Sequence, residues 1–208
     1  MRRIKGLYAV TPDMTGTALL LAKVETVLAA GVRLLQYRNK SADAAMRGEQ
    51  ARALRILCRR HTATLIINDD VALARAIDAD GVHVGADDPA LAIAREQLGG
   101  EKIIGVSCYD DLQRARAAAA QGADYVAFGS FFASAVKPGA VRAPLSVLPA
   151  ARALGVPVVA IGGITLGNAG GLIAAGADAV AVISALFAAP DPARATREFC
   201  QLFQVEAA

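Results

Sequence analysis

Short, mainly apolar segments alternate along the whole chain with longer segments in which apolar residues recur at helical spacing. The short segments are rich in β-branched residues, which is typical of strands buried on both faces. The predicted strands cover residues 6–10, 34–37, 64–67, 81–84, 103–106, 124–128, 157–161 and 179–183. The predicted helices cover residues 19–28, 44–60, 71–77, 89–98, 112–120, 145–154, a segment that includes 172–175, and 193–203.

Eight strand–helix units in 208 residues predict an α/β fold, namely a (β/α)8 TIM barrel that forms a single domain over residues 1–208. A doubly wound sheet is the competing architecture, but such sheets usually carry a Gly-x-Gly-x-x-Gly turn after the first strand. This chain has Thr11-Pro12-Asp13 there, which favours the barrel. With 55% hydrophobic residues, the chain can bury one substantial core.

Charge and cysteine content narrow the class of protein. The net charge is +3 and the Lys and Arg residues are scattered through the helices, so we expect no nucleic-acid partner. No apolar run approaches the ~18 residues that cross a bilayer, so we expect no membrane partner. Cys58, Cys108 and Cys200 are far apart, which fits a reducing cytoplasm. We therefore expect a cytoplasmic protein that binds small molecules. These features are compatible with either a monomer or a homo-oligomer.

Acidic residues follow two consecutive predicted strands. Residues 64–67 are followed by Asn68-Asp69-Asp70, and residues 81–84 are followed closely by Asp87 and Asp88. Because parallel strands end at the same side of the sheet, Asp69 and Asp88 are expected to face one another and share Mg²⁺. The alternative is that Asp70 and Asp87 cap helices while Asp69 and Asp88 are merely solvated.

Polar residues alternate at the end of the second predicted strand. Gln36, Arg38 and Lys40 follow a period of two, so they are expected to project to the same side. Cations inside a barrel are costly without an anionic partner, and phosphate or diphosphate suits an arginine fork and a lysine charge. The alternative is a surface strand end with solvated bases.

A second anion site is expected after the last two predicted strands. Gly162 and Gly163 follow one of these strands and Ser184 follows the other, where phosphate-binding barrels present backbone N–H groups. Ser107 also follows a strand, and Lys137 lies in the long segment 129–144, which is expected to form a functional loop.

Neither histidine is expected to act as a base. His61 ends a predicted helix, and His83 lies inside a strand where a packed or hydrogen-bonded role is expected. Mg²⁺ and cations around a leaving group, with no evident base, indicate ionisation of a diphosphate ester followed by capture of the cation.

These residues resemble the thiamine-phosphate synthase family. The matching segments, in order from about residue 7 to about residue 187, are YAVT, QYRNK, INDDVALARAIDADGVHVGADD, IIGVS, GADYVAFGSFFAS-x-x-KP, VVAIGGI and VISALF. The resemblance implies a Mg²⁺-dependent transferase that joins 4-amino-2-methyl-5-hydroxymethylpyrimidine diphosphate to 4-methyl-5-hydroxyethylthiazole phosphate. The products would be thiamine phosphate and diphosphate, formed by dissociative substitution.

The resemblance also implies roles for individual residues. Asp69 and Asp88 would hold Mg²⁺, and Gln36 and Asn68 would contact the pyrimidine. The diphosphate would be bound by Arg38, Lys40, Ser107 and Lys137, of which Arg38, Ser107 and Lys137 would be the catalytic residues. The thiazole phosphate would be bound by Gly163, Ile183 and Ser184.

Two positions depart from the family pattern. The family usually has Thr-x-Thr-Lys where this chain has Ser134-Ala135-Val136-Lys137. Ser134 keeps a hydroxyl for substrate binding, but Val136 cannot form a hydrogen bond, which would cost roughly 1.5–3 kcal/mol. Ala86 stands where the family commonly has Gln.

Two other functions fit the same fold. A thiazole tautomerase would need a general base near the thiazole, and the chain has no histidine in its second half. A catalytically weak barrel that binds thiamine phosphates would bind ligand without turnover, and only Val136 and Ala86 favour it.

Overall fold

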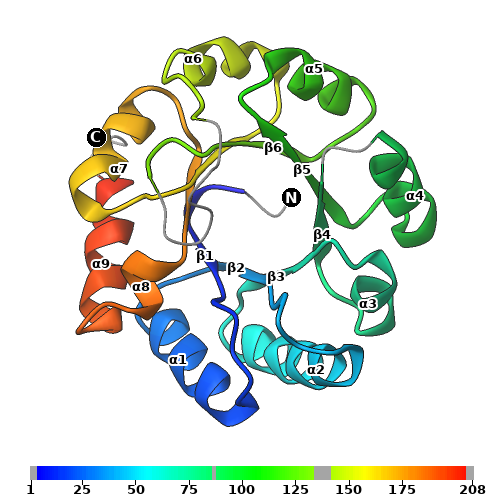
Figure 1. The fold of residues 1–208 in the computed structure, drawn as a ribbon, viewed down its shortest axis with the longest axis vertical. Coiled ribbons are helices and arrows are strands. Elements are labelled where there is room, and N and C mark those ends of the chain that lie inside the picture. The colour runs from blue at the N-terminus through cyan, green and yellow to red at the C-terminus, as the bar shows by residue number, and fades with distance from the viewer. Residues whose placement is uncertain (1–3, 86–87, 134–141, 205–208) are drawn as a thin grey trace.

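The chain forms a closed barrel of eight parallel strands in sequence order, with the last strand pairing with the first. The computed structural model describes residues 4–85, 88–133 and 142–204, and of residues 88–90 the backbone alone. Figure 1 shows the ring of strands with the helices outside it. The predicted (β/α)8 barrel is therefore confirmed.

The strands are short and the connections are mostly helical. The strands are β1 (Gly6–Val10), β2 (Leu34–Tyr37), β3 (Thr64–Asn68), β4 (Gly81–Val84), β5 (Ile103–Tyr109), β6 (Tyr125–Phe128), β7 (Val158–Ile161) and β8 (Ala179–Val182). The helices are α1 (Thr17–Ala29), α2 (Ala44–Arg60), α3 (Val71–Ala76), α4 (Asp88–Leu98), α5 (Leu112–Ala120), α6 (Val147–Ala151), the 3₁₀ helix η1 (Arg152–Leu154), α7 (Leu166–Ala174), α8 (Ser184–Phe187) and α9 (Pro192–Leu202). None of the described helices is both long and apolar enough to cross a membrane.

Most predicted elements agree with the observed ones to within two residues at each end, and three show a more informative difference. The predicted strand 103–106 continues to Tyr109 through a bulge after Ser107. The predicted helix 145–154 is divided into α6 and η1. The last predicted strand stops at Val182, and the short helix α8 begins at Ser184. A helix of four residues is too short to show a helical period in the sequence, so the hydrophobic pattern alone does not delimit α8.

The alternation of side chains along the strands divides the core into two layers. In β8, Ala179 and Ala181 belong to the cluster inside the barrel, whereas Val180 and Val182 pack in the cluster between barrel and helices. The interior cluster also contains the aromatic rings of Tyr8 and Tyr125. Burial on both faces explains why the strands read as nearly continuous apolar runs.

An aspartate lies directly before each of the strands β4, β6 and β8. Its backbone N–H donates to the carbonyl of a residue in the preceding strand, and its carboxylate accepts from the N–H of that same residue. The pairs are Asp80 with Leu65, Asp124 with Ile104, and Asp178 with Val158, at distances of 2.7–3.0 Å. Each pair ties two neighbouring strands together at the end of the barrel opposite the mouth.

Gly105 makes room for a tyrosine inside the barrel. It lies opposite Tyr125 in the register of β5 with β6. A Cβ at position 105 would lie 1.9 Å from Cζ of Tyr125 and 2.4 Å from its hydroxyl oxygen. The large ring therefore requires a glycine on the adjacent strand.

We predict that Gly105→Ala lowers the free energy of unfolding by about 1–3 kcal/mol, because the Tyr125 ring must move within a packed interior. Gly170→Ala is the matched control, since a Cβ there meets open space on α7. The control is expected to raise stability by about 0.5–1 kcal/mol. Urea denaturation measures both values, and equal stability of the two variants would contradict the packing argument.

Candidate active site at the mouth of the barrel

A cavity of about 580 Å³ opens at the carboxyl ends of the strands. The predicted site residues that line it are Gln36, Arg38, Asn68, Ser107 and Ile183. They come from β2, from the ends of β3 and β5, and from the segment after β8, so the barrel gathers residues that are far apart in the sequence. This mouth cavity is where sites lie in barrels of this class.

Arg38 is held at the mouth by groups that follow β1. Its Nη1 lies 3.1 Å from Oδ1 of Asp13, and its backbone N–H donates to the Thr11 hydroxyl, which in turn donates to the Arg38 carbonyl. The Arg38 side chain is largely buried. The Asp13 carboxylate is therefore the anionic partner that the buried Arg38 guanidinium was expected to require.

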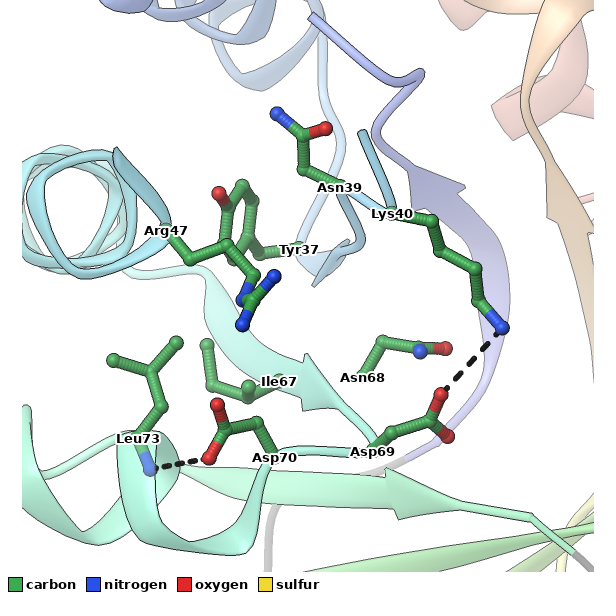
Figure 2. Close-up of a pocket in the computed structure, with 9 residues that line it drawn as sticks. All are labelled: Tyr37, Asn39, Lys40, Arg47, Ile67, Asn68, Asp69, Asp70 and Leu73. Atoms are coloured by element: carbon green, nitrogen blue, oxygen red, sulfur yellow. Dashed lines mark hydrogen bonds and ion pairs between the residues drawn. The ribbon is translucent and has the colours of Figure 1, made fainter. Parts of the chain in front are cut away.

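Lys40 does not project into the mouth cavity with Gln36 and Arg38. Strand β2 ends at Tyr37, so the alternation of side chains does not extend to position 40. Its Nζ instead lies 3.7 Å from Oδ2 of Asp69, in an adjacent pocket of about 380 Å³. Figure 2 shows this ion pair at one side of the pocket, with Asn68 beside it. Because Asn68 lines both cavities, the two are neighbours.

The turn after β3 gives its two aspartates, Asp69 and Asp70, different roles. Asp69 has a φ of 62°, and its backbone N–H donates to the carbonyl of His83 on β4. Its carboxylate is exposed, whereas Asp70 caps α3 by accepting from the N–H of Leu73. The cap expected of Asp70 in the alternative interpretation is thus present, and Asp69 is the carboxylate left at the mouth.

Several predicted residues lie outside the described part of the chain. These are Ser134, Lys137, Val136, Ala86, Asp87 and the side chain of Asp88. Within residues 4–85, 88–133 and 142–204, no group of three or more His, Cys, Asp or Glu side chains is placed to hold a metal. The expected pairing of Asp69 with Asp88 therefore stays a prediction.

The glycines after β7 are required by packing. Gly162 and Gly163 have φ values of 105° and 62°. A Cβ at 162 would lie 2.1 Å from the Ser130 hydroxyl, and one at 163 would lie 2.3 Å from the Ala133 carbonyl. Gly162 and Ile183 line the mouth cavity, while Gly163 and Ser184 are the next residues along the chain. The segment after β6 thus packs directly on the segment after β7.

Hydrogen bonds join polar groups inside the barrel in a way that the sequence did not predict. Gln36 Nε2 donates to the hydroxyl of Tyr8, which lies 2.9 Å from the hydroxyl of Tyr125. His83 lies between Tyr125 and Ser107, with Nδ1 2.9 Å from the Tyr125 hydroxyl and Nε2 2.9 Å from Ser107 Oγ. The hydrogen-bonded role expected of His83 is confirmed. Tyr8 and Tyr125 were missed, because a tyrosine in an apolar strand gives no sign of which face it occupies.

Burial controls the ionisation of these groups. Desolvation lowers the pKa of His83 to about 4, partly offset by the charge of Asp69, and raises the pKa values of Tyr8 and Tyr125 above their usual value. At neutral pH the imidazole is therefore uncharged and both phenols keep their protons. The floor of the mouth cavity is a neutral hydrogen-bonded surface, and its charges lie at the rim.

Comparison with known proteins identifies the family. The family model described as thiamine monophosphate synthase matches residues 7–186. The thiamine-phosphate synthase of Azoarcus sp. (strain BH72) is 60% identical over 202 residues, which cover 97% of this chain and 98% of that protein. The thiamine-phosphate synthase of Methylobacillus flagellatus is 58% identical over 200 residues, covering 96% of each chain.

A solved structure agrees with these matches. The thiamine phosphate pyrophosphorylase from Pyrococcus furiosus superposes with a TM-score of 0.84 at 33% sequence identity. The match covers 98% of this chain and 97% of that one. The chain belongs to the thiamine monophosphate synthase family.

Proposed function

We propose that the chain is a transferase that joins 4-amino-2-methyl-5-hydroxymethylpyrimidine diphosphate to 4-methyl-5-hydroxyethylthiazole phosphate. The C–O bond between the pyrimidine methylene and the diphosphate breaks, and a C–N bond forms between that methylene and the thiazole nitrogen. The products are thiamine phosphate and diphosphate. The observation that carries the proposal is the mouth cavity, which brings Gln36, Arg38, Asn68 and Ser107 together opposite Gly162 and Ile183 in a chain of this family.

The diphosphate half of the site lies at the ends of β2 to β5. Arg38 offers a guanidinium fork, Ser107 offers a hydroxyl, and Lys40 stands at the rim beside Asn68. Diphosphate would compete with Asp13 for Arg38 and with Asp69 for Lys40, so its binding exchanges one anionic partner for another. The pyrimidine would contact Gln36 and Asn68.

The residues at this rim fit a magnesium ion. Mg²⁺ prefers oxygen ligands and is commonly bound by one or two carboxylates together with substrate phosphates. Asp69 presents an exposed carboxylate at the mouth, and Asp88 begins α4 after the neighbouring strand β4. These two residues would hold the ion, which would neutralise charge on the departing diphosphate. Lys137 would add a cation from the loop after β6.

The thiazole phosphate half lies at the ends of β7 and β8. The left-handed conformations of Gly162 and Gly163 allow the backbone to approach a ligand closely. The first N–H groups of a helix have no partner within that helix, so the N–H of Ser184 at the start of α8 is available to a phosphate oxygen. Gly163, Ile183 and Ser184 would bind the phosphate mainly through the backbone.

Turnover distinguishes the synthase from the two other functions. Purified protein is mixed with the pyrimidine diphosphate, the thiazole phosphate and Mg²⁺, and thiamine phosphate is measured after oxidation to a fluorescent product. We predict turnover that excess chelator abolishes. Isomerisation of the thiazole without coupling would favour the tautomerase, and binding without turnover would favour the weak binding barrel.

Asp69→Asn tests the metal assignment without disturbing the turn, since asparagine tolerates the left-handed conformation of residue 69. We predict that kcat falls about 100-fold or more, because the variant loses a charged oxygen ligand of the ion. Binding of thiazole phosphate, measured by calorimetry, should stay nearly unchanged.

Asp191→Asn is the control for Asp69→Asn, because Asp191 caps α9 and asparagine can keep that cap. It should retain the activity of the unmodified protein. If Asp69→Asn lost thiazole-phosphate binding and turnover to the same extent, the two anion sites would not be distinct.

A further inference from the structure

Four hydrogen bonds connect Gln36 to Ser107 through the barrel interior. Between these two ends stand Tyr8, Tyr125 and His83, and each of the four bonds is 2.9 Å long. The rings are held in place by one another, since His83 stacks on Tyr125 at 5.5 Å and Tyr8 meets Tyr125 edge-on at 6.1 Å. Gln36 and Ser107, at the two ends of this hydrogen-bond series, both line the mouth cavity.

The donor at one end sets the direction of the series, because a buried O–H group needs an acceptor for its hydrogen. A hydroxyl carries one hydrogen, and a neutral imidazole carries one N–H. The Tyr8 hydroxyl contacts Gln36 Nε2, which is itself a donor, and the Tyr125 hydroxyl, so we infer that Tyr8 donates to Tyr125. The Tyr125 hydroxyl then donates its own hydrogen to Nδ1 of His83. Nδ1 is then unprotonated, so the proton of His83 is on Nε2 and is donated to Ser107 Oγ.

The last bond leaves Ser107 with a free hydrogen. Its oxygen would then accept from His83, and its own O–H would be free to donate into the mouth cavity that Ser107 lines. If the series of hydrogen bonds ran in the opposite direction, Ser107 would donate to His83 and would present only oxygen lone pairs to a ligand. Those lone pairs would repel an anion.

We propose that Tyr8, Tyr125 and His83 are positioning residues that hold the Ser107 hydroxyl as a hydrogen-bond donor toward an anionic oxygen of the substrate. The identity of that anion as the diphosphate rests on the proposed function. The same direction leaves the Gln36 amide oxygen as an acceptor. A ligand that carries an amino group for Gln36 and an anion for Ser107 would therefore favour one arrangement of the whole chain, and each contact would strengthen the other.

The position of the His83 proton is the direct test. Two-bond ¹H–¹⁵N correlation spectra of the ligand-free protein report which imidazole nitrogen carries hydrogen, and a His61→Gln variant assigns the two histidines. We expect His83 to be protonated on Nε2. Protonation on Nδ1 would mean that the hydrogen bonds run in the opposite direction. That result would overturn the proposal, whether or not the protein catalyses the reaction.

A double-mutant cycle tests whether the hydrogen-bond series affects catalysis through Ser107. Loss of a hydrogen bond to a charged group corresponds to about 10- to 150-fold, so we expect Ser107→Ala to lower kcat within that range and Tyr125→Phe to lower it about tenfold. The KM for thiazole phosphate should not change. In the double variant, Tyr125→Phe should add little to the effect of Ser107→Ala.

Thr196→Val is the control, because it also removes a buried hydroxyl, one that donates to the Pro192 carbonyl in α9, away from the mouth. It should leave kcat unchanged. Independent, multiplying effects of Tyr125→Phe and Ser107→Ala would show that Tyr125 acts only on structure and would contradict the proposal. A lack of turnover in the unmodified protein would instead count against the proposed function alone, since the His83 spectrum does not depend on it.

Discussion

The barrel can hold polar side chains in its interior only if they satisfy one another. A buried polar group without a partner costs about 1–3 kcal/mol. Tyr8, Tyr125 and His83 meet this requirement by bonding in series, and the series ends at Gln36 and Ser107 on the mouth cavity. The demand for hydrogen bonds inside the barrel thereby fixes the groups that the cavity floor presents to a ligand.

Charge is arranged differently from the neutral floor. Arg38 is paired with Asp13 and Lys40 with Asp69, so each of these two cations has a carboxylate within 4 Å. Such pairs keep the ligand-free mouth close to neutral and make anion binding an exchange of partners. The proposed synthase reaction fits this arrangement, because a diphosphate with Mg²⁺ can satisfy the cations and the Asp69 carboxylate at the same time.

The sequence predicted the barrel and much of the mouth because strand ends can be located from apolar runs alone. Gln36, Arg38, Asn68 and Ser107 each stand at such an end. Lys40 was misplaced because its strand stops at Tyr37, and a strand end is uncertain by a few residues. Contacts between distant strands, such as Gly105 with Tyr125, leave no local pattern. The repeated Gly-Ala-Asp before β6 and β8 does leave a local pattern, and its aspartate ties the neighbouring strands together.

In the proposed function the mouth holds two separate anion sites, one at β2 to β5 and one at β7 and β8. The most direct measurement is calorimetric titration of thiazole phosphate into protein already saturated with Mg²⁺ and inorganic diphosphate. We expect thiazole phosphate to bind without displacing diphosphate, with an affinity close to that for diphosphate-free protein. Competition between the two anions would contradict it, because they would then share a single site.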